Sequence, residues 1–347
     1  MSQPKPIHVV GGGLAGLTLG IGLRLEGIPV VIWEAGDYPR HRVCGEFISG
    51  RGQETLRRLG LLRLLREAGA RPARTSAFFT SQSRFPLQVL PQEALCLSRF
   101  VLDELLARRF RELGGELRTE ARWQGSDWEE GRVRASGRRI QTTENGWRWF
   151  GLKAHARGVI LEADLEMHFL RNAYVGLCRI SDAEVNVCGL FRAGQQGVEP
   201  NSRAGWKERL RGHPGSLLSE RFDQADWLDE SFCSVAGLSP LGRLADGEWA
   251  IGDALTMIPP VTGNGMSMAF ESAELAIGPL REFSMGRLSW SAAQARALRE
   301  FKATFSRRLW CAKWLQWGIF QPGIKSLVLP AATRSSLFWR LFFQLTR

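Results

Sequence analysis

The chain has 347 residues, 44% hydrophobic and 23% charged, so it is long enough to bury a large core in one or two closely packed domains. No run of eighteen or more uncharged apolar residues occurs, which argues against a membrane-spanning helix. The net charge is +11, and the six cysteines form no C-x-x-C pair, so zinc, iron–sulfur and disulfide frameworks are not expected and no metal site is predicted.

The chain starts MSQPKPIHVVGGG, without the apolar region and cleavage site of a signal peptide, so we expect a cytoplasmic protein. A short apolar strand at 7–10 runs directly into GGGLAG and then an apolar helical segment. This order makes the G-x-G-x-x-G spacing a strong indication of a dinucleotide-binding turn. Gly11 permits the tight turn, Gly13 lets the backbone approach a pyrophosphate, and Gly16 lets the helix pack on the strand.

A second strand, at 29–33, ends in Glu34, about twenty residues beyond the turn. A carboxylate at this place accepts hydrogen bonds from both hydroxyls of an adenosine ribose. That favours FAD or NAD over NADPH, whose 2′-phosphate would clash with the charge. The motif alone does not choose between FAD and NAD.

Residues 147–193 are expected to form an antiparallel sheet. Apolar and polar residues alternate from Leu161 to Phe169, and the segments AYVGLCRI and EVNVCGLF follow at hairpin spacing. We expect the polar side of the first segment to be a solvated face. Its members are Glu162, Asp164, Glu166 and His168.

Residues 252–276 read GDALTMIPPVTGNGMSMAFESAELA, with two prolines and two glycines ahead of a helical run. The prolines restrict the approach of the chain, and Gly263 and Gly265 leave the backbone bare of side chains. This turn, the GGGLAG turn, EAGDYPRHRVCGEFISGRG after the second strand, and CLSRFVLDELLARRFRELGGEL together resemble the FAD-dependent oxidoreductases of para-hydroxybenzoate hydroxylase type. Within that superfamily the chain is most similar to the branch of geranylgeranyl reductases, flavin-dependent halogenases and related aromatic hydroxylases.

The resemblance covers most of residues 7–280. It implies an α/β fold, α+β overall, with a Rossmann-like FAD-binding domain, an inserted antiparallel-sheet substrate domain and C-terminal helices. We place the two parts of the FAD-binding domain at 1–146 and 236–290. The substrate sheet then occupies 147–235, and the C-terminal helices occupy 291–347.

The resemblance also implies cofactor contacts. Glu34 holds the adenosine ribose, Arg42 approaches the linker of FAD, Arg99 reaches the pyrophosphate, and Asp253 of the Gly252–Asp253 pair binds the ribityl chain. The segment from Ile258 to Gly265 packs along the isoalloxazine, and the N-terminus of the next helix stabilises negative charge near N1 of the reduced ring. The contacts in this segment are Pro260, Gly263, Asn264, Gly265 and Met266.

Two departures from the superfamily patterns matter. A second motif that usually ends in Ala-Asp-Gly reads Ala135-Ser136-Gly137-Arg138 here, so the resemblance assigns this loop no role. The segment from Tyr174 to Arg179 keeps only the tyrosine of the reductase pattern, and Trp147-Arg-Trp149 imitates the halogenase pattern one strand too early. Neither halogenation nor prenyl reduction is positively indicated.

The resemblance implies a monooxygenase that hydroxylates a lipophilic phenol or polyketide-like aromatic through a flavin C4a-hydroperoxide. The chain shows one nucleotide-binding motif, so NAD(P)H is expected as a transient reductant, or a separate flavin reductase supplies the electrons. Alternatives are a reductase of C=C bonds in a prenyl or polyene lipid, a halogenase, and a flavoprotein without turnover. The oligomeric state is left open.

For the reacting groups, Cys44 matches a cysteine near the flavin in the reductase-like branch, although an inert thiol is an equal alternative. His155 is a hypothetical general base, by its position alone. The expected substrate contacts are Trp149, Lys153, His168 and Tyr174.

The last part of the chain is both basic and aromatic. No acidic residue follows Glu300, while eight lysines and arginines do. The aromatics are too dense for a nucleic-acid surface, so no nucleic-acid partner is expected. We expect closing helices packed on the body with basic outer faces, and the alternative is a peripheral membrane contact through residues 301–347.

Overall fold

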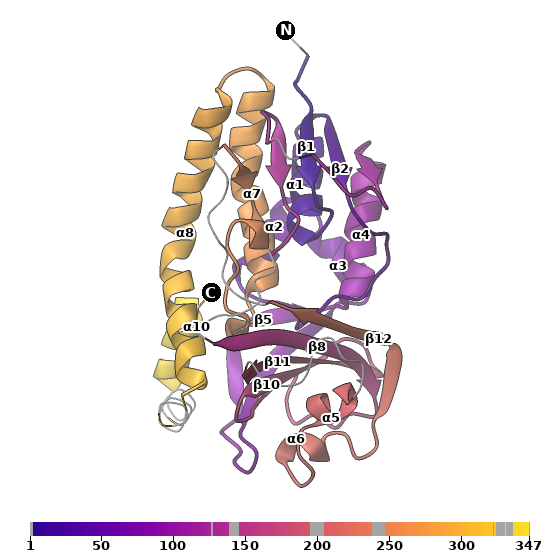
Figure 1. The fold of residues 1–347 in the computed structure, drawn as a ribbon, viewed down its shortest axis with the longest axis vertical. Coiled ribbons are helices and arrows are strands. Elements are labelled where there is room, and N and C mark those ends of the chain that lie inside the picture. Colours follow the sequence, from indigo (N-terminus) through magenta and orange to yellow (C-terminus); the bar gives the residue numbers. More distant parts are fainter. Residues whose placement is uncertain are drawn as a thin grey trace.

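The computed structural model describes residues 3–125, 128–138, 146–194, 205–237, 247–321 and 336–346, together with residues 323 and 330. Two sheets dominate this part of the chain, and Figure 1 shows the nucleotide-binding half above the second sheet. Two long helices run side by side along one edge of the molecule, and the longer one extends to the level of the second sheet. The expected α/β architecture is confirmed.

The first sheet is parallel, with the strand order β13-β7-β1-β2-β6. Its strands are β1 (Ile7–Val10), β2 (Val30–Trp33), β6 (Glu116–Arg118), β7 (Arg132–Arg134) and β13 (Trp249–Ala250). Helix α1 (Leu14–Leu25) follows β1 directly, and its residues 14–23 are all buried. The strand, turn and helix predicted from the glycine pattern are therefore present, with the carboxyl ends of β1 and β2 side by side.

The other helices of this half are amphipathic segments that bury one face on the same core. They are α2 (Arg51–Arg58), α3 (Leu62–Glu67), α4 (Arg99–Glu112) and α7 (Gly265–Ser284). Ser98 begins α4 by accepting a hydrogen bond from Phe100 N, a common N-cap arrangement. A single hydrophobic cluster joins β1, β2, α1, α4 and α7, so the sheet and its helices form one packed layer system.

The second sheet is mixed, with the order β12-β8-β11-β10-β9-β4-β5-β3. Its strands are β3 (Phe47–Ile48), β4 (Arg71–Phe79), β5 (Gln88–Cys96), β8 (Trp147–Arg157), β9 (Leu165–Phe169), β10 (Ala173–Arg179), β11 (Glu184–Gly194) and β12 (Asp226–Ala236). The strands β8, β11, β10 and β9 pair antiparallel, as the sequence predicted. Three further strands from residues 47–96 join this sheet, and β4 pairs with β9 in parallel.

Two expectations about residues 161–169 are wrong. The strand is limited to β9, because Asp164 accepts hydrogen bonds from the backbone N–H groups of Arg74 and Thr75 and ends the segment before it. The polar side of β9 is not solvated, since Glu166 and His168 are only 3% and 1% exposed. The helices α5 (Trp206–Arg211) and α6 (Leu217–Glu220) lie beneath the sheet in Figure 1, and Arg221 follows α6 and pairs with Glu166 at 2.9 Å.

Helix α8 (Trp290–Ile319) runs beside α7 and continues past it to the level of the second sheet, where α10 (Ser336–Thr346) lies against its end (Figure 1). The described residues of the segment 301–346 are thus helical apart from Phe320 and Gln321. Among the described residues, no helix is at once long enough and apolar enough to cross a bilayer.

Candidate active site

The glycine turn between β1 and α1 is shaped by close backbone contacts. Gly11 has φ +113°, and a Cβ on it would lie 2.5 Å from the carbonyl oxygen of Ala135. A Cβ on Gly16 would collide with the carbonyl oxygen of Gly11. Gly13, by contrast, has nothing within 4 Å of its Cβ position, and α1 starts after it without a side-chain cap. The turn therefore presents open space in front of free helix N–H groups, as a phosphate requires.

Glu34 lies at the end of β2 and is 6% exposed. Its carboxylate accepts hydrogen bonds from Gly12 N at 2.8 Å and Gly36 N at 2.9 Å, and it pairs with Arg40 at 2.8 Å. Burial would raise the pKa of Glu34, but the hydrogen bonds from Gly36 and Arg40 outweigh it and lower the pKa. Glu34 is therefore an ionised acceptor beside the glycine turn, which fits the predicted ribose contact.

The segment after β13 packs directly against the start of α1. Gly252 has φ +59°, and a Cβ there would lie 2.8 Å from the Cβ of Ala15. Burial raises the pKa of the neighbouring Asp253 to about 6, although Arg138 and Arg99 oppose this shift. The segment that carries Asp253 therefore lies beside the glycine turn at the start of α1, and the ribityl contact of Asp253 stays a prediction.

The proline–glycine turn ends in helix α7. Residues Pro260–Thr262 form the short helix η2, and a Cβ on Gly263, where φ is +61°, would collide with the ring of Phe47. The side chain of Asn264 does not cap α7, because its Nδ2 donates to the carbonyl oxygen of Thr346 at 2.9 Å. The first N–H groups of α7 therefore have no side-chain cap, which suits the predicted contact with a flavin edge.

Several arginines lie close to Glu34 and Asp253. Burial and the neighbouring Arg40 and Arg99 lower the pKa of Arg42, as expected where cations are crowded together without a bound anion. Arg99 does not reach toward Gly13 by itself, since its guanidinium is paired with Asp103 at 2.6 and 2.8 Å. The buried Nε of Arg138 has no hydrogen-bond partner within the described residues. An anionic diphosphate would satisfy this charge, so the residues fit FAD.

A cavity of about 240 Å³ lies between the η2 turn, the second sheet and the C-terminal helices. Its walls are almost entirely apolar and come from three groups of elements. They include Cys44, Gly45, Val261 and Gly263 near the nucleotide-binding half; Met167, Phe169, Tyr174, Gly176, Cys178 and Cys188 on the sheet; and Leu315, Ile319, Trp339 and Phe343 on α8 and α10. The hydroxyl of Tyr174 is buried without a hydrogen-bond partner among the described residues, so it is a free polar group in an apolar wall.

The other predicted substrate contacts are not among the residues that line this cavity. Trp149 packs edge-on against Phe320, with ring centroids 4.7 Å apart. His168 stacks on Phe79 and binds Glu166, so it belongs to the cluster described above with Arg221. Lys153 and His155 are buried at a third place, beside the loop that carries Cys44.

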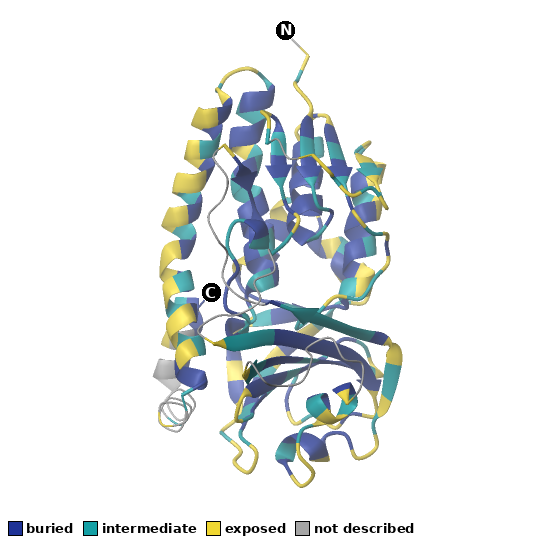
Figure 2. Cartoon of the chain, in the orientation of Figure 1, coloured by how far each residue is buried: buried dark blue, intermediate teal, exposed yellow. Residues whose placement is uncertain are grey.

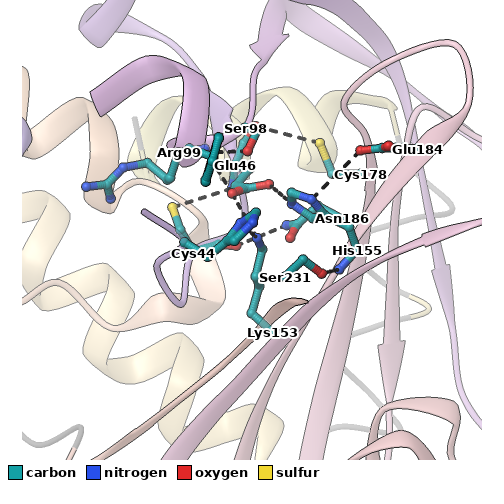
Figure 3. Close-up of polar contacts among 12 residues, drawn as sticks. Cys44, Glu46, Ser98, Arg99, Lys153, His155, Cys178, Glu184, Asn186 and Ser231 are labelled. Atoms are coloured by element: carbon teal, nitrogen blue, oxygen red, sulfur yellow. Dashed lines mark hydrogen bonds and ion pairs between the residues drawn. The ribbon is translucent and has the colours of Figure 1, made fainter. Parts of the chain in front are cut away.

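That third place is a buried polar cluster around Glu46, shown in Figure 3. Glu46 is fully buried and has φ +58°. Its carboxylate accepts from Arg99 N at 2.9 Å, meets Lys153 Nζ at 3.3 Å, and meets His155 Nε2 at 2.7 Å. Burial would raise the pKa of Glu46, but His155 and Lys153 outweigh it and lower the pKa. Glu46 is therefore an ionised anchor.

The Glu46 cluster ties the loop at 41–47 to the sheet. Lys153 Nζ lies 3.1 Å from Nδ1 of His41, and burial together with Lys153 lowers the pKa of His41 to about 4. Asn186 on β11 donates to the carbonyl oxygen of Cys44 at 3.0 Å (Figure 3). The loop that forms one cavity wall is thus held by the sheet that forms the opposite wall.

The structure shows where the two predicted catalytic residues, Cys44 and His155, lie. Cys44 lines the cavity, and burial raises the pKa of its thiol, so it is protonated at neutral pH. His155 does not line the cavity, and its Nε2 is engaged by Glu46, so the structure does not support a direct general-base role. The sequence reasoning missed Glu46, although this acid stands inside the quoted motif PRHRVCGE, two residues after Cys44.

Comparisons with known proteins bear on the cofactor and on the fold. Residues 5–146 match the family model of the FAD binding domain. No curated protein matches the chain in sequence. In fold it is similar to the flavin-dependent brominase Bmp2, with 18% identity, a TM-score of 0.78, and coverage of 99% of this chain and 93% of that one.

The fold is also similar to p-nitrophenol 4-monooxygenase PnpA from Pseudomonas putida DLL-E4, with 14% identity, a TM-score of 0.76, and coverage of 100% and 99%. PqsL, a probable FAD-dependent monooxygenase from Pseudomonas aeruginosa, shares 14% identity with a TM-score of 0.68 and coverage of 99% and 100%. At these identities the likeness shows the fold alone. The match over residues 5–146, together with the glycine turn inside it, shows that this chain carries an FAD-binding domain.

Proposed function

We propose that this chain is an FAD-dependent monooxygenase that hydroxylates a lipophilic aromatic compound held in the apolar cavity. The observation that carries the proposal is the position of the cavity. One wall is the η2 turn and the Cys44–Gly45 loop, next to the start of α7, and the opposite wall is the apolar face of β9, β10 and β11. When bound, FAD supplies the redox chemistry by accepting a hydride from a reduced nicotinamide and activating dioxygen.

The chain's own residues would bind the cofactor and orient the substrate. The Gly13 turn and Arg42 would hold the phosphates, Glu34 would hold the ribose, and Asp253 would bind the ribityl chain. The uncapped start of α7 would favour negative charge at the ring edge that it faces. The apolar walls exclude water from the reacting atoms, and the Tyr174 hydroxyl is free to hydrogen-bond a phenol oxygen.

The Glu46 cluster would contribute by holding one wall of the cavity in place. Because its ionised carboxylate binds Lys153, His155 and the backbone of Arg99, it fixes the Cys44–Gly45 wall relative to the sheet. A fixed wall holds the substrate in one orientation above the cofactor, which is the main requirement when the cofactor carries the chemistry.

The test is oxygen uptake by the FAD-loaded protein with NADPH, or with NADH, and a panel of phenols of increasing alkyl length. We expect uptake that depends on the phenol and yields a hydroxylated product in equal amount. A flavin reductase is added in a parallel arm, which separates a protein that binds NAD(P)H transiently from one served by a partner. Uptake that yields only hydrogen peroxide in every arm would contradict the proposal.

A second candidate is reduction of a C=C bond in a prenyl or polyene lipid, and the position of Cys44 in the cavity favours it. Reduced FAD, when bound, would supply a hydride to one carbon of the double bond, and the Cys44 thiol, which burial keeps protonated at neutral pH, could supply the proton to the other. Anaerobic incubation with dithionite and a polyprenyl substrate distinguishes the two. A saturated product that is lost in Cys44→Ala would support the reductase over the monooxygenase.

A further inference from the structure

The outer face of α8 exposes three tryptophans in its C-terminal half. Trp310, Trp314 and Trp317 are 63%, 54% and 51% exposed, which is unusual for the largest apolar side chain. Their rings form a continuous ridge, with centroids 5.9 Å apart for the first pair and 5.5 Å for the second. Figure 2 shows the outer side of α8 as an exposed strip that faces away from both sheets.

Positive charge borders this tryptophan ridge on both sides. At 3.6 residues per turn, Arg307 and Lys313 project about 60° to either side of Trp310. Both are exposed, as is Lys302 two turns earlier. No acidic residue follows Glu300 in the sequence, whereas nearer the start of α8 Arg296 is paired with Glu300 at 3.1 Å. The ridge therefore combines aromatic rings with cations that form no ion pair within the part of the chain that the structure describes.

The opposite side of the same helical segment lines the cavity. Leu315 and Ile319 on α8 and Trp339 and Phe343 on α10 belong to the cavity wall. The cavity is thus separated from the tryptophan ridge by the thickness of one helix. Leu341 on α10 is 49% exposed and adds an apolar side chain next to α8.

We propose that the tryptophan ridge docks this chain on the surface of an anionic lipid bilayer, and that the lipophilic substrate passes from the bilayer into the cavity beside α8 and α10. Tryptophan rings favour the interfacial region of a bilayer, and flanking lysine and arginine bind anionic headgroups. A second copy of the chain is a poorer occupant, because a two-fold contact would bring the same cations together. The docking stands independently, whereas the substrate route rests on the proposed function.

Docking is tested with the full FAD-loaded chain and vesicles of phosphatidylcholine, alone or mixed with phosphatidylglycerol, in a flotation assay. We expect flotation with the anionic vesicles and a blue shift of tryptophan emission. The triple variant Trp310→Ser/Trp314→Ser/Trp317→Ser should lower the partition coefficient at least about tenfold. Arg307→Gln and Lys313→Gln should each lower it roughly fivefold, and only for anionic vesicles.

The matched control is Leu298→Ser, which removes an exposed apolar side chain from α8 about 120° away from Trp310 and should leave flotation unchanged. A bound-flavin spectrum checks that each variant is folded. Absence of flotation by the native chain, or equal flotation of the triple variant, would overturn the docking. A triple variant that loses self-association on a sizing column instead of lipid binding would assign the ridge to a second copy.

The route is tested separately, by comparing turnover of a long-chain phenol embedded in vesicles with turnover of a short, water-soluble phenol. We expect the triple variant to lose the first activity and keep the second. Loss of both activities, or of neither, would overturn the proposed passage of the substrate from the bilayer into the cavity. Flotation needs no turnover, so the docking can stand when the proposed function fails.

Discussion

The second sheet carries two buried ionic clusters of nearly the same composition. In one, Glu46 binds His155 at 2.7 Å and Lys153 at 3.3 Å. In the other, Glu166 binds His168 and Arg221, each at 2.9 Å. The first joins the Cys44 loop of the nucleotide-binding half to the sheet, and the second joins the end of α6 to the sheet. The two clusters therefore differ in position: the Glu46 cluster holds the loop that carries Cys44, whereas Glu166 lies in the sheet side of the cavity wall.

The Glu46 cluster should show the larger effect. Glu46→Ala leaves the fully buried Lys153 without its carboxylate, so we expect the free energy of unfolding to fall by about 3–5 kcal/mol. We also expect weaker FAD binding, because the loop between Arg42 and Phe47 loses its anchor. Denaturant titration and flavin-fluorescence titration measure the two effects. The milder Glu46→Gln keeps the shape, and FAD affinity equal to that of the native chain in both variants would refute the role.

Glu166→Ala should lower stability without weakening FAD binding. Arg221 keeps a second partner, Glu162, at 2.7 Å, so the expected loss is smaller, about 1–3 kcal/mol. FAD affinity should stay at the native value once the protein is folded, because Glu166 lies on the sheet side of the cavity and not in the loop that carries Cys44. The same two titrations check this, and a loss of FAD affinity here would remove the distinction between the clusters.

The Glu46 cluster should have a smaller effect on how the free energy of unfolding depends on pH. His41, beside Lys153, has a folded pKa of about 4, below its ordinary value near 6.5, so the unfolded state binds more protons between these limits. The stability that depends on neutral His41 is therefore present above pH 6.5 and is lost as the pH falls toward 4. Because His41 is only half-buried, we expect about 1–2 kcal/mol.

Denaturant midpoints measured across this pH range check the effect. In His41→Gln the free energy of unfolding should depend less on pH between pH 4 and 6.5, since an amide does not titrate there. The exposed His213→Gln is the matched control and should leave the curve unchanged. An unaltered slope in His41→Gln would show that this histidine does not couple the loop to the sheet.

The nucleotide-binding half could be predicted because its determinants are close in sequence. Gly11, Gly13 and Gly16 act on one turn, and Glu34 ends the next strand of the same βαβ unit. The hairpin of β10 and β11 was predictable for the same reason. These contacts depend on local spacing, which the chain displays directly.

The features that could not be predicted depend on contacts between residues far apart in the sequence. The alternation in β9 predicted two faces, but it could not show that Arg221 and the segment after α6 would cover Glu166 and His168. The parallel pairing of β4 with β9 joins residues about ninety positions apart, so no local pattern reports it. Glu46 escaped notice because its partners Lys153 and His155 lie on a strand more than a hundred residues away.

The central claim, that chemistry occurs in the cavity next to the bound flavin, is tested most directly by blocking the cavity. Gly176 on β10 lines it beside Tyr174, and a Cβ there meets only backbone oxygens, at 3.7 Å or more. Gly176→Leu should keep the bound-flavin spectrum while the yield of hydroxylated product per dioxygen falls at least about tenfold. A variant that binds FAD and hydroxylates as well as the native chain would contradict the account.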